Sequence, residues 1–254
     1  MDSGARKELL IEAIRDPEPA RRGEAAYEMG LSRDASFLPF LERALEDSEP
    51  KVRWRAVQAI GKLDLASPPA ALSGLLQDES AAVRAEALAA LGRYGRAEYV
   101  DAFARLLDDP DLQVRYKAIE ALGDIGTVPD LVLGRVLFFL EDANSSLRMH
   151  AALTLGKCRY RPAAPALVRR LADPQPTVRG PAAWALGRLR DDTALLPLIH
   201  SLQDEGEFVR IYVYQALVDF GKRAIPLLER AIPNADPGQR QLLERLIEEI
   251  REGE

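Results

Sequence analysis

The chain is 254 residues long, and 47% of its residues are hydrophobic, which is ample for a core, whereas only 6% are aromatic. Its 34 Lys and Arg against 40 Asp and Glu give a net charge of −6, which argues against a general nucleic-acid binder, because such proteins carry a basic patch. The single cysteine, Cys158, excludes an intrachain disulfide and a multi-cysteine metal site.

No targeting or membrane segment is expected from the sequence. Residues 1–22 are charged throughout and lack the apolar core of a signal peptide. The most apolar stretch, residues 131–140, is interrupted by Arg135 and is too short to cross a bilayer. Together with the single cysteine, these features lead us to expect a soluble cytoplasmic protein.

A repeat of 31 residues, once lengthened to 33, runs along the chain. Each repeat has an Asp that is followed six residues later by an Arg, and the seven pairs are Asp16 and Arg22, Asp47 and Arg53, Asp78 and Arg84, Asp109 and Arg115, Asp142 and Arg148, Asp173 and Arg179, Asp204 and Arg210. A period of this length indicates stacked structural units, because one unit cannot bury its own apolar face. We expect one continuous array over residues 1–235.

Each repeat is predicted to hold two helices, one before and one after the Asp. In the third repeat, residues 68–77 carry leucines at helical spacing behind two prolines, and residues 79–95 carry a second apolar stripe. Second helices begin at a proline or behind a capping residue, and several end at a glycine. These signals are Pro19, Pro50, Pro176, Ser80, Asp111, Asn144, Gly95, Gly126 and Gly221. No alternating pattern of strand length occurs, so the fold class is all-α.

Three places depart from the regular repeat. The first repeat has Arg21 where the others have an apolar residue. The fifth has two extra residues and crowds Phe138 and Phe139 into its first helix, which indicates either a local kink or an apolar edge for a partner. Residues 236–254 show one apolar stripe and a charged face, as a C-terminal capping helix requires. With both ends capped, a monomer is expected.

A column of glycines stands in the last turn of the second helices. Because a glycine inside a helix costs about 1 kcal/mol relative to alanine, its recurrence in register indicates a steric need. We expect close contact with the first helix of the next repeat. The column is Gly30, Gly61, Gly92, Gly123, Gly156 and Gly187.

Segments such as DSEPKVRWRAVQAIG and DPDLQVRYKAIEALG carry the pattern D-x4-[VL]-R-x2-A-x3-L-G. This pattern resembles the bacterial HEAT-like repeats named after the phycobilin lyases, and the resemblance covers about residues 6–236. It implies a right-handed α-solenoid of about seven two-helix repeats with a C-terminal capping helix. It also implies that the Asp and Arg columns form a ladder along the turns and that the second helices line the concave surface. The family consists mainly of binding scaffolds, with a few enzymes.

The Asp and Arg columns could be read as a row of charged binding sites. A pair that recurs in every repeat is better explained by stacking, through turn hydrogen bonds and charge pairing near a helix N-terminus. We therefore interpret the ladder as structural.

The outward positions of the second helices are the candidate partner-binding site. They fall seven, eight, eleven and fifteen residues after each Asp, and they hold both tryptophans of the chain beside several cations. Exposed aromatic rings next to Arg are typical of binding hot spots. The alternative is that the rings pack over the adjacent repeat. The candidate residues are Tyr27, Trp54, Arg55, Tyr116, Lys117, His150, Trp184, Arg188 and Tyr212.

Residues for catalysis, metal binding or cofactor binding are not found. His150 and His200 are the only histidines and form no His-Glu pair at helical spacing, which argues against the iron-carrying HEAT-repeat hydroxylases. No glycine-rich phosphate loop occurs. Cys158 lies in an inward column and is interpreted as a buried thiol.

The sequence therefore favours a non-catalytic scaffold or adaptor that binds a protein or peptide through the concave surface. Three alternatives stay open. A phycobilin lyase-type protein would share the repeat and could hold a bilin among the outward aromatics and carboxylates. A HEAT-like DNA glycosylase would also use concave Trp and Asp, although the acidic charge counts against it. The third is a structural subunit of a larger complex.

Overall fold

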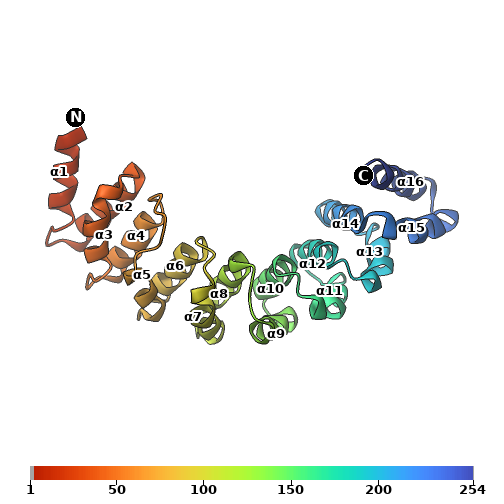
Figure 1. Cartoon of the computed structure of the whole chain (residues 1–254), viewed down its shortest axis with the longest axis horizontal. Helices are drawn as coiled ribbons and strands as arrows, with labels where there is room; N and C mark the ends of the chain where they lie inside the picture. Colours follow the sequence, from red (N-terminus) through yellow and green to blue (C-terminus); the bar gives the residue numbers. More distant parts are fainter. Residues whose placement is uncertain (1–2, 254) are drawn as a thin grey trace. The chain divides into compact units, whose positions relative to one another are not determined.

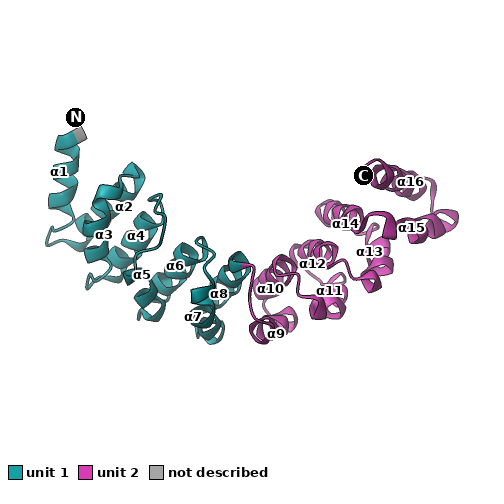
Figure 2. Ribbon diagram, viewed as in Figure 1, with its two compact units in different colours: residues 1–125 teal, residues 126–254 magenta. Residues whose placement is uncertain are grey.

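The computed structural model describes residues 3–253, and every regular element among them is a helix, so the predicted all-α class is confirmed. The chain forms two compact units, residues 1–125 and residues 126–254, shown in two colours in Figure 2. Their boundary falls inside the one 33-residue interval, between Asp109 and Asp142. None of the described helices has the length and apolar character that crossing a bilayer requires.

Unit 1 is built from four helix pairs, in which an A helix precedes the repeat Asp and a B helix follows it. The pairs are α1 (Ser3–Ala13) with α2 (Pro19–Ser32), α3 (Leu38–Ala44) with α4 (Pro50–Ile60), α5 (Ala71–Gly74) with α6 (Ala81–Gly92), and α7 (Val100–Arg105) with α8 (Leu112–Ile125). Short 3₁₀ turns flank the A helices at η1 (Ala35–Phe37), η2 (Leu75–Gln77), η3 (Ala97–Tyr99) and η4 (Leu106–Asp108). Consecutive B helices pack against each other within the unit (Figure 1).

Unit 2 repeats this arrangement with α9 (Asp130–Phe138) and α10 (Ser145–Lys157), α11 (Ala164–Arg170) and α12 (Pro176–Leu189), α13 (Leu195–Ser201) and α14 (Glu207–Phe220), and α15 (Ile225–Ala231) and α16 (Pro237–Glu252). Its 3₁₀ turns are η5 (Phe139–Glu141), η6 (Arg161–Ala163), η7 (Asp192–Ala194), η8 (Gly221–Arg223) and η9 (Ile232–Asn234). The expected capping helix is α16, and it packs on both α14 and α15. Because α15 takes the place of an A helix, the described chain ends on an eighth helix pair.

Local sequence signals set the helix ends. Pro19, Pro50 and Pro176 occupy the first helical position of their B helices, where the missing N–H has no intrahelical partner to lose. Gly95 and Gly221 follow B helices at positive φ values of 59° and 62°, which glycine adopts without strain because it has no Cβ. These positions match the predicted starts and ends.

The glycine column marks where B helices touch. A methyl group on Gly30 would lie 2.6 Å from the Cα of Ala59, and one on Gly187 would lie 2.7 Å from the Cα of Ala216. Both alanines belong to the B helix of the next repeat, so the expected contact with the next A helix is wrong. The A helices are short, and the closest approach in the stack is therefore made between B helices.

The first helix of unit 2 leaves apolar side chains in solvent. Leu131 is 84% exposed and Phe138 is 79% exposed, and their separation of seven positions places both on one side of α9. Val132, Leu133 and Val136 of the same helix are buried. The apolar crowding noted in the sequence thus exceeds what one face of α9 buries.

Candidate functional site

Each repeat turn is organised by its Asp. One carboxylate oxygen accepts the backbone N–H two residues further along, as in Asp173 with Gln175 at 3.0 Å and Asp47 with Glu49 at 2.9 Å. The same bond occurs in all seven turns. It satisfies a backbone donor at the start of the B helix, which has no partner inside the helix.

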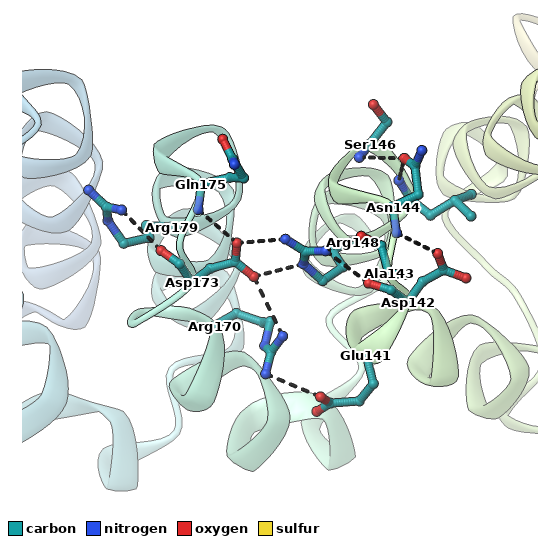
Figure 3. Close-up of polar contacts among 11 residues, drawn as sticks. Glu141, Asp142, Ala143, Asn144, Ser146, Arg148, Arg170, Asp173, Gln175 and Arg179 are labelled. Carbon is teal, nitrogen blue, oxygen red and sulfur yellow. Dashed lines mark hydrogen bonds and ion pairs between the residues drawn. The ribbon is translucent and has the colours of Figure 1, made fainter.

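The Arg of each pair connects one turn to the next. Arg148 donates from Nη1 to the carbonyl oxygen of Asp142 in its own turn, at 2.8 Å. Its Nε and Nη2 donate to both carboxylate oxygens of Asp173 in the next turn, each at 2.8 Å (Figure 3). The same two-oxygen contact joins Arg22 to Asp47, Arg53 to Asp78, Arg84 to Asp109, and Arg179 to Asp204. Arg115 and Arg210 donate to the backbone carbonyl oxygens of Asp109 and Asp204 in their own turns, as Arg148 does to Asp142.

Burial and charge at this ladder favour the ionised carboxylates. The Asp173 side chain is fully buried against an Arg148 side chain that is 9% exposed. Hydrogen bonds from Arg22 hold the pKa of Asp47 below its ordinary value of 3.8. At Asp173 burial acts to raise the pKa, but hydrogen bonds from Arg148 and the Gln175 N–H outweigh it, and the pKa is again lowered. All these contacts are made within the protein, which supports a structural role for the ladder.

Cations and aromatic rings gather on two neighbouring B helices of unit 1, α2 and α4, and on the residues just after α4. The Arg55 guanidinium carbon lies 4.5 Å from the Tyr27 ring centroid and 5.0 Å from the Trp54 ring centroid. Lys62 Nζ lies 4.5 Å from the same Tyr27 ring. All four side chains are half-buried, and we call them the α2–α4 cluster.

The α2–α4 cluster contains cations without a carboxylate partner. The hydrogen bond of Arg55 is a long one, 3.4 Å to Gln58 Oε1. Neither Arg55 nor Lys62 forms an ion pair with another described residue. A guanidinium has five N–H donors, so most of those on Arg55 are left for water or a ligand.

The remaining candidates of unit 1 lie on α8. Lys117 sits 5.8 Å from the Tyr116 ring and forms an ion pair of 2.7 Å with Glu120. Both Tyr116 and Lys117 are half-buried. They are close to each other because they are neighbours in sequence, and Lys117 already has a counter-charge.

The candidate rings of unit 2 pack across neighbouring repeats. A methyl group on Gly156 would lie 2.7 Å from the Trp184 ring, and one on Gly180 would lie 2.8 Å from the Tyr212 ring. Glycine at these positions therefore makes room for the rings. Arg188 is exposed, with its guanidinium carbon 6.0 Å from Trp184. His150 is half-buried on α10.

Two exposed apolar residues of α14 extend this surface and were not among the candidates. Phe208 is 61% exposed and meets Tyr212 edge-on at 4.8 Å, and Ile211 is 59% exposed. Ile211 stands seven residues after Asp204, in one of the outward columns, so its position could have been found from the sequence. Phe208 lies outside those columns.

No group of three or more His, Cys, Asp and Glu side chains among residues 3–253 is placed to hold a metal ion. Cys158 is half-buried, and burial raises the pKa of its thiol to about 11. A thiol with so high a pKa is almost entirely protonated at neutral pH and is a weak nucleophile.

A family model for HEAT repeats matches residues 7–76, 68–136 and 165–247. Among solved structures, the CpcE and CpcF complex of phycocyanin lyase from Nostoc sp. PCC7120 is similar over 96% of this chain and 94% of that chain, with 23% identity and a TM-score of 0.57. YibA of Escherichia coli is similar over 99% of this chain and 93% of that chain, with 18% identity and a TM-score of 0.68. No curated protein matches significantly.

At these identities the two structures show a shared fold alone. The family match covers most of the chain, and it coincides with the helix pairs and the Asp and Arg turns described above. The resemblance expected from the repeat pattern is thereby confirmed, and the chain belongs to the HEAT repeat family.

Proposed function

We propose that the chain is a non-catalytic scaffold that binds a protein or peptide segment on the outward faces of its B helices. The observation that carries this proposal is the α2–α4 cluster, where Trp54 and Tyr27 flank a half-buried Arg55 that has no carboxylate partner among the described residues. Trp, Tyr and Arg are the residues most enriched at binding hot spots.

The chemistry of the cluster fits a protein ligand. The rings offer apolar area with little side-chain entropy to lose, and they hold Arg55 in place through contacts worth about 0.5–2 kcal/mol each. The guanidinium can then donate to a carboxylate or to peptide carbonyl oxygens of the partner. On α12 and α14, Trp184 and Tyr212 add further aromatic area, although both also pack between repeats.

We further propose that the protein is a monomer, that it acts in the cytoplasm and that it does not bind nucleic acid. Unit 1, with 17 Lys and Arg against 23 Asp and Glu, carries the whole net charge of −6. Such a charge opposes binding to a polyanion. Light scattering of the purified protein checks the oligomeric state, and cell fractionation checks the location.

Affinity capture with matched variants tests the proposal. We expect a protein that is retained by the wild type and lost by the Trp54→Ala/Trp184→Ala variant. Phe138→Ala is the control, because it removes an exposed aromatic ring from an A helix outside the proposed surface. Melting temperatures of all three proteins separate lost binding from lost folding. A partner retained equally by all three would contradict the proposed surface.

Bilin handling is the second candidate function. It is favoured by the fold likeness to the CpcE and CpcF complex of phycocyanin lyase, which extends over 96% of this chain. Titration of the purified protein with a free bilin, followed by visible absorption, tests it. A saturable spectral shift that is lost in Trp54→Ala/Trp184→Ala supports this function, and an unchanged bilin spectrum removes it.

A further inference from the structure

An open groove of about 400 Å³ lies at the C-terminal end of unit 2. It is formed by α13, α15, η9 and the first turns of α16, and we call it the terminal groove. Leu202 and Gln203, which directly precede the repeat Asp of the seventh turn, form part of its wall. The groove therefore lies next to the last turn of the ladder.

The groove occurs where the ladder is interrupted. At the two earlier steps of this unit, an Arg binds an Asp that stands 25 residues further along. The residue 25 positions after Arg210 is Ala235, and Ala235 lines the groove. The hydrogen bonds of Arg210 go to the carbonyl oxygens of Asp204 and Glu205 in its own turn.

The chain around η9 explains this interruption. Asp236 follows the helix proline Pro226 by ten residues, whereas Asp47 follows Pro39 by eight. The longer segment moves the carboxylate out of the ladder position, and Asp236 instead caps α16, with its side chain accepting the Gln239 N–H at 2.9 Å. Among the described residues, no ion pair of the ladder type joins Arg210 of α14 to the turn before α16, and the groove lies next to this turn.

The lining of the groove combines apolar walls with a single permanent cation. Leu196, Leu227 and Leu242 contribute side chains that remain partly exposed. Arg230 is exposed at the groove and makes no hydrogen bond or ion pair with another described residue. No Asp or Glu is among the lining residues, although the whole chain has more acidic than basic residues.

We propose that the terminal groove binds a small amphipathic carboxylate, with its apolar part between the leucines and its carboxylate on Arg230. The volume lies near the lower end of the 300–1,000 Å³ typical of small-molecule pockets, which suits a compact ligand. A cation without an opposing carboxylate selects an anionic group, and guanidinium binds carboxylate through two parallel hydrogen bonds. None of the residues that line the groove belongs to the proposed protein-binding surface.

Displacement of a fluorescent probe from the full chain tests this site. Anilinonaphthalene sulfonate, an apolar anion, is bound first and is then displaced by decanoate or by decanol, which has the same chain length without the carboxylate. We expect decanoate to displace the probe at about tenfold lower concentration, because a hydrogen bond to a charged group is worth about 1.5–3 kcal/mol. Arg230→Gln should abolish this preference for decanoate. Leu227→Gln should weaken the binding of both decanoate and decanol.

Arg240→Gln is the matched control, because Arg240 is an exposed residue of α16 outside the groove. Circular dichroism and melting temperature verify that each variant is folded. Equal displacement by decanoate and decanol from the wild type would overturn the proposal, as would a decanoate preference that persists in Arg230→Gln. Competition by a leucine-terminated peptide at lower concentration than decanoate would also overturn it, because the groove would then be a peptide site.

Discussion

Replacing Asp173 by Asn measures how much one ladder step stabilises the stack. The amide keeps the shape of the side chain and keeps an oxygen for the Gln175 N–H, but it removes the charge that faces Arg148. Arg148 is 9% exposed and would keep a buried guanidinium without its counter-charge. Removing one partner of a buried ion pair costs about 3–5 kcal/mol. Because one acceptor oxygen remains, we expect a loss of about 3 kcal/mol.

The control for this substitution is Asp191→Asn in the same unit. Asp191 accepts the Thr193 N–H at 3.0 Å in a similar turn but binds no Arg in the described structure. Its replacement should change stability by less than about 1 kcal/mol, because the amide keeps an acceptor oxygen for the Thr193 N–H and leaves no buried cation without its counter-charge. Thermal and urea unfolding followed by circular dichroism separate the two, since 3 kcal/mol corresponds to roughly 6–12 °C in melting temperature. Equal losses in the two variants would refute the role assigned to the ladder.

Further predictions concern packing, the thiol and acid stability. Gly156→Ala should destabilise the protein by about 1–3 kcal/mol through overpacking against Trp184, whereas Gly74→Ala, with open space around it, should stabilise it by up to about 1 kcal/mol; chemical unfolding checks both. Cys158, whose pKa is raised to about 11 by burial, should react with a disulfide reagent at pH 8 much more slowly in the folded than in the unfolded protein. The lowered pKa of Asp47 means that its ion pair with Arg22 contributes fully above the ordinary Asp value of 3.8 and is lost as the pH falls further. The stability difference between wild type and Arg22→Gln should therefore shrink between pH 6 and pH 3, and an unchanged difference would contradict this.

The repeat fold could be predicted because each unit repeats the same local signals. The Asp at each turn, the proline at the first position of several B helices and the glycine at several ends are local features, and the structure contains them where the sequence indicates. Which helices of neighbouring repeats touch is not determined by such local features. The contact of Gly30 with Ala59 in the next B helix depends on how two repeats stack, which the spacing within one repeat does not determine.

The candidate surface was predictable only in part for the same reason. Column positions identify Trp54 and Arg55 as outward residues, but the contact of Arg55 with Tyr27 is made between two repeats. The terminal groove depends on a displaced Asp236 and on Ala235 at the ladder position. The regular repeat pattern does not predict such a site, because the site occurs where the sequence departs from that pattern.

The most direct test of the scaffold is the affinity of the captured partner for wild type, Trp54→Ala and Phe138→Ala, measured by calorimetry. Hot-spot truncations cost about 2 kcal/mol or more, so Trp54→Ala should weaken binding by at least about tenfold, with Phe138→Ala unchanged. All three proteins should have melting temperatures within a few degrees of one another, so that a difference in affinity reflects binding and not loss of folding. Equal affinities for all three, or a loss in Trp54→Ala that matches its loss of folding, would contradict binding through the B helices.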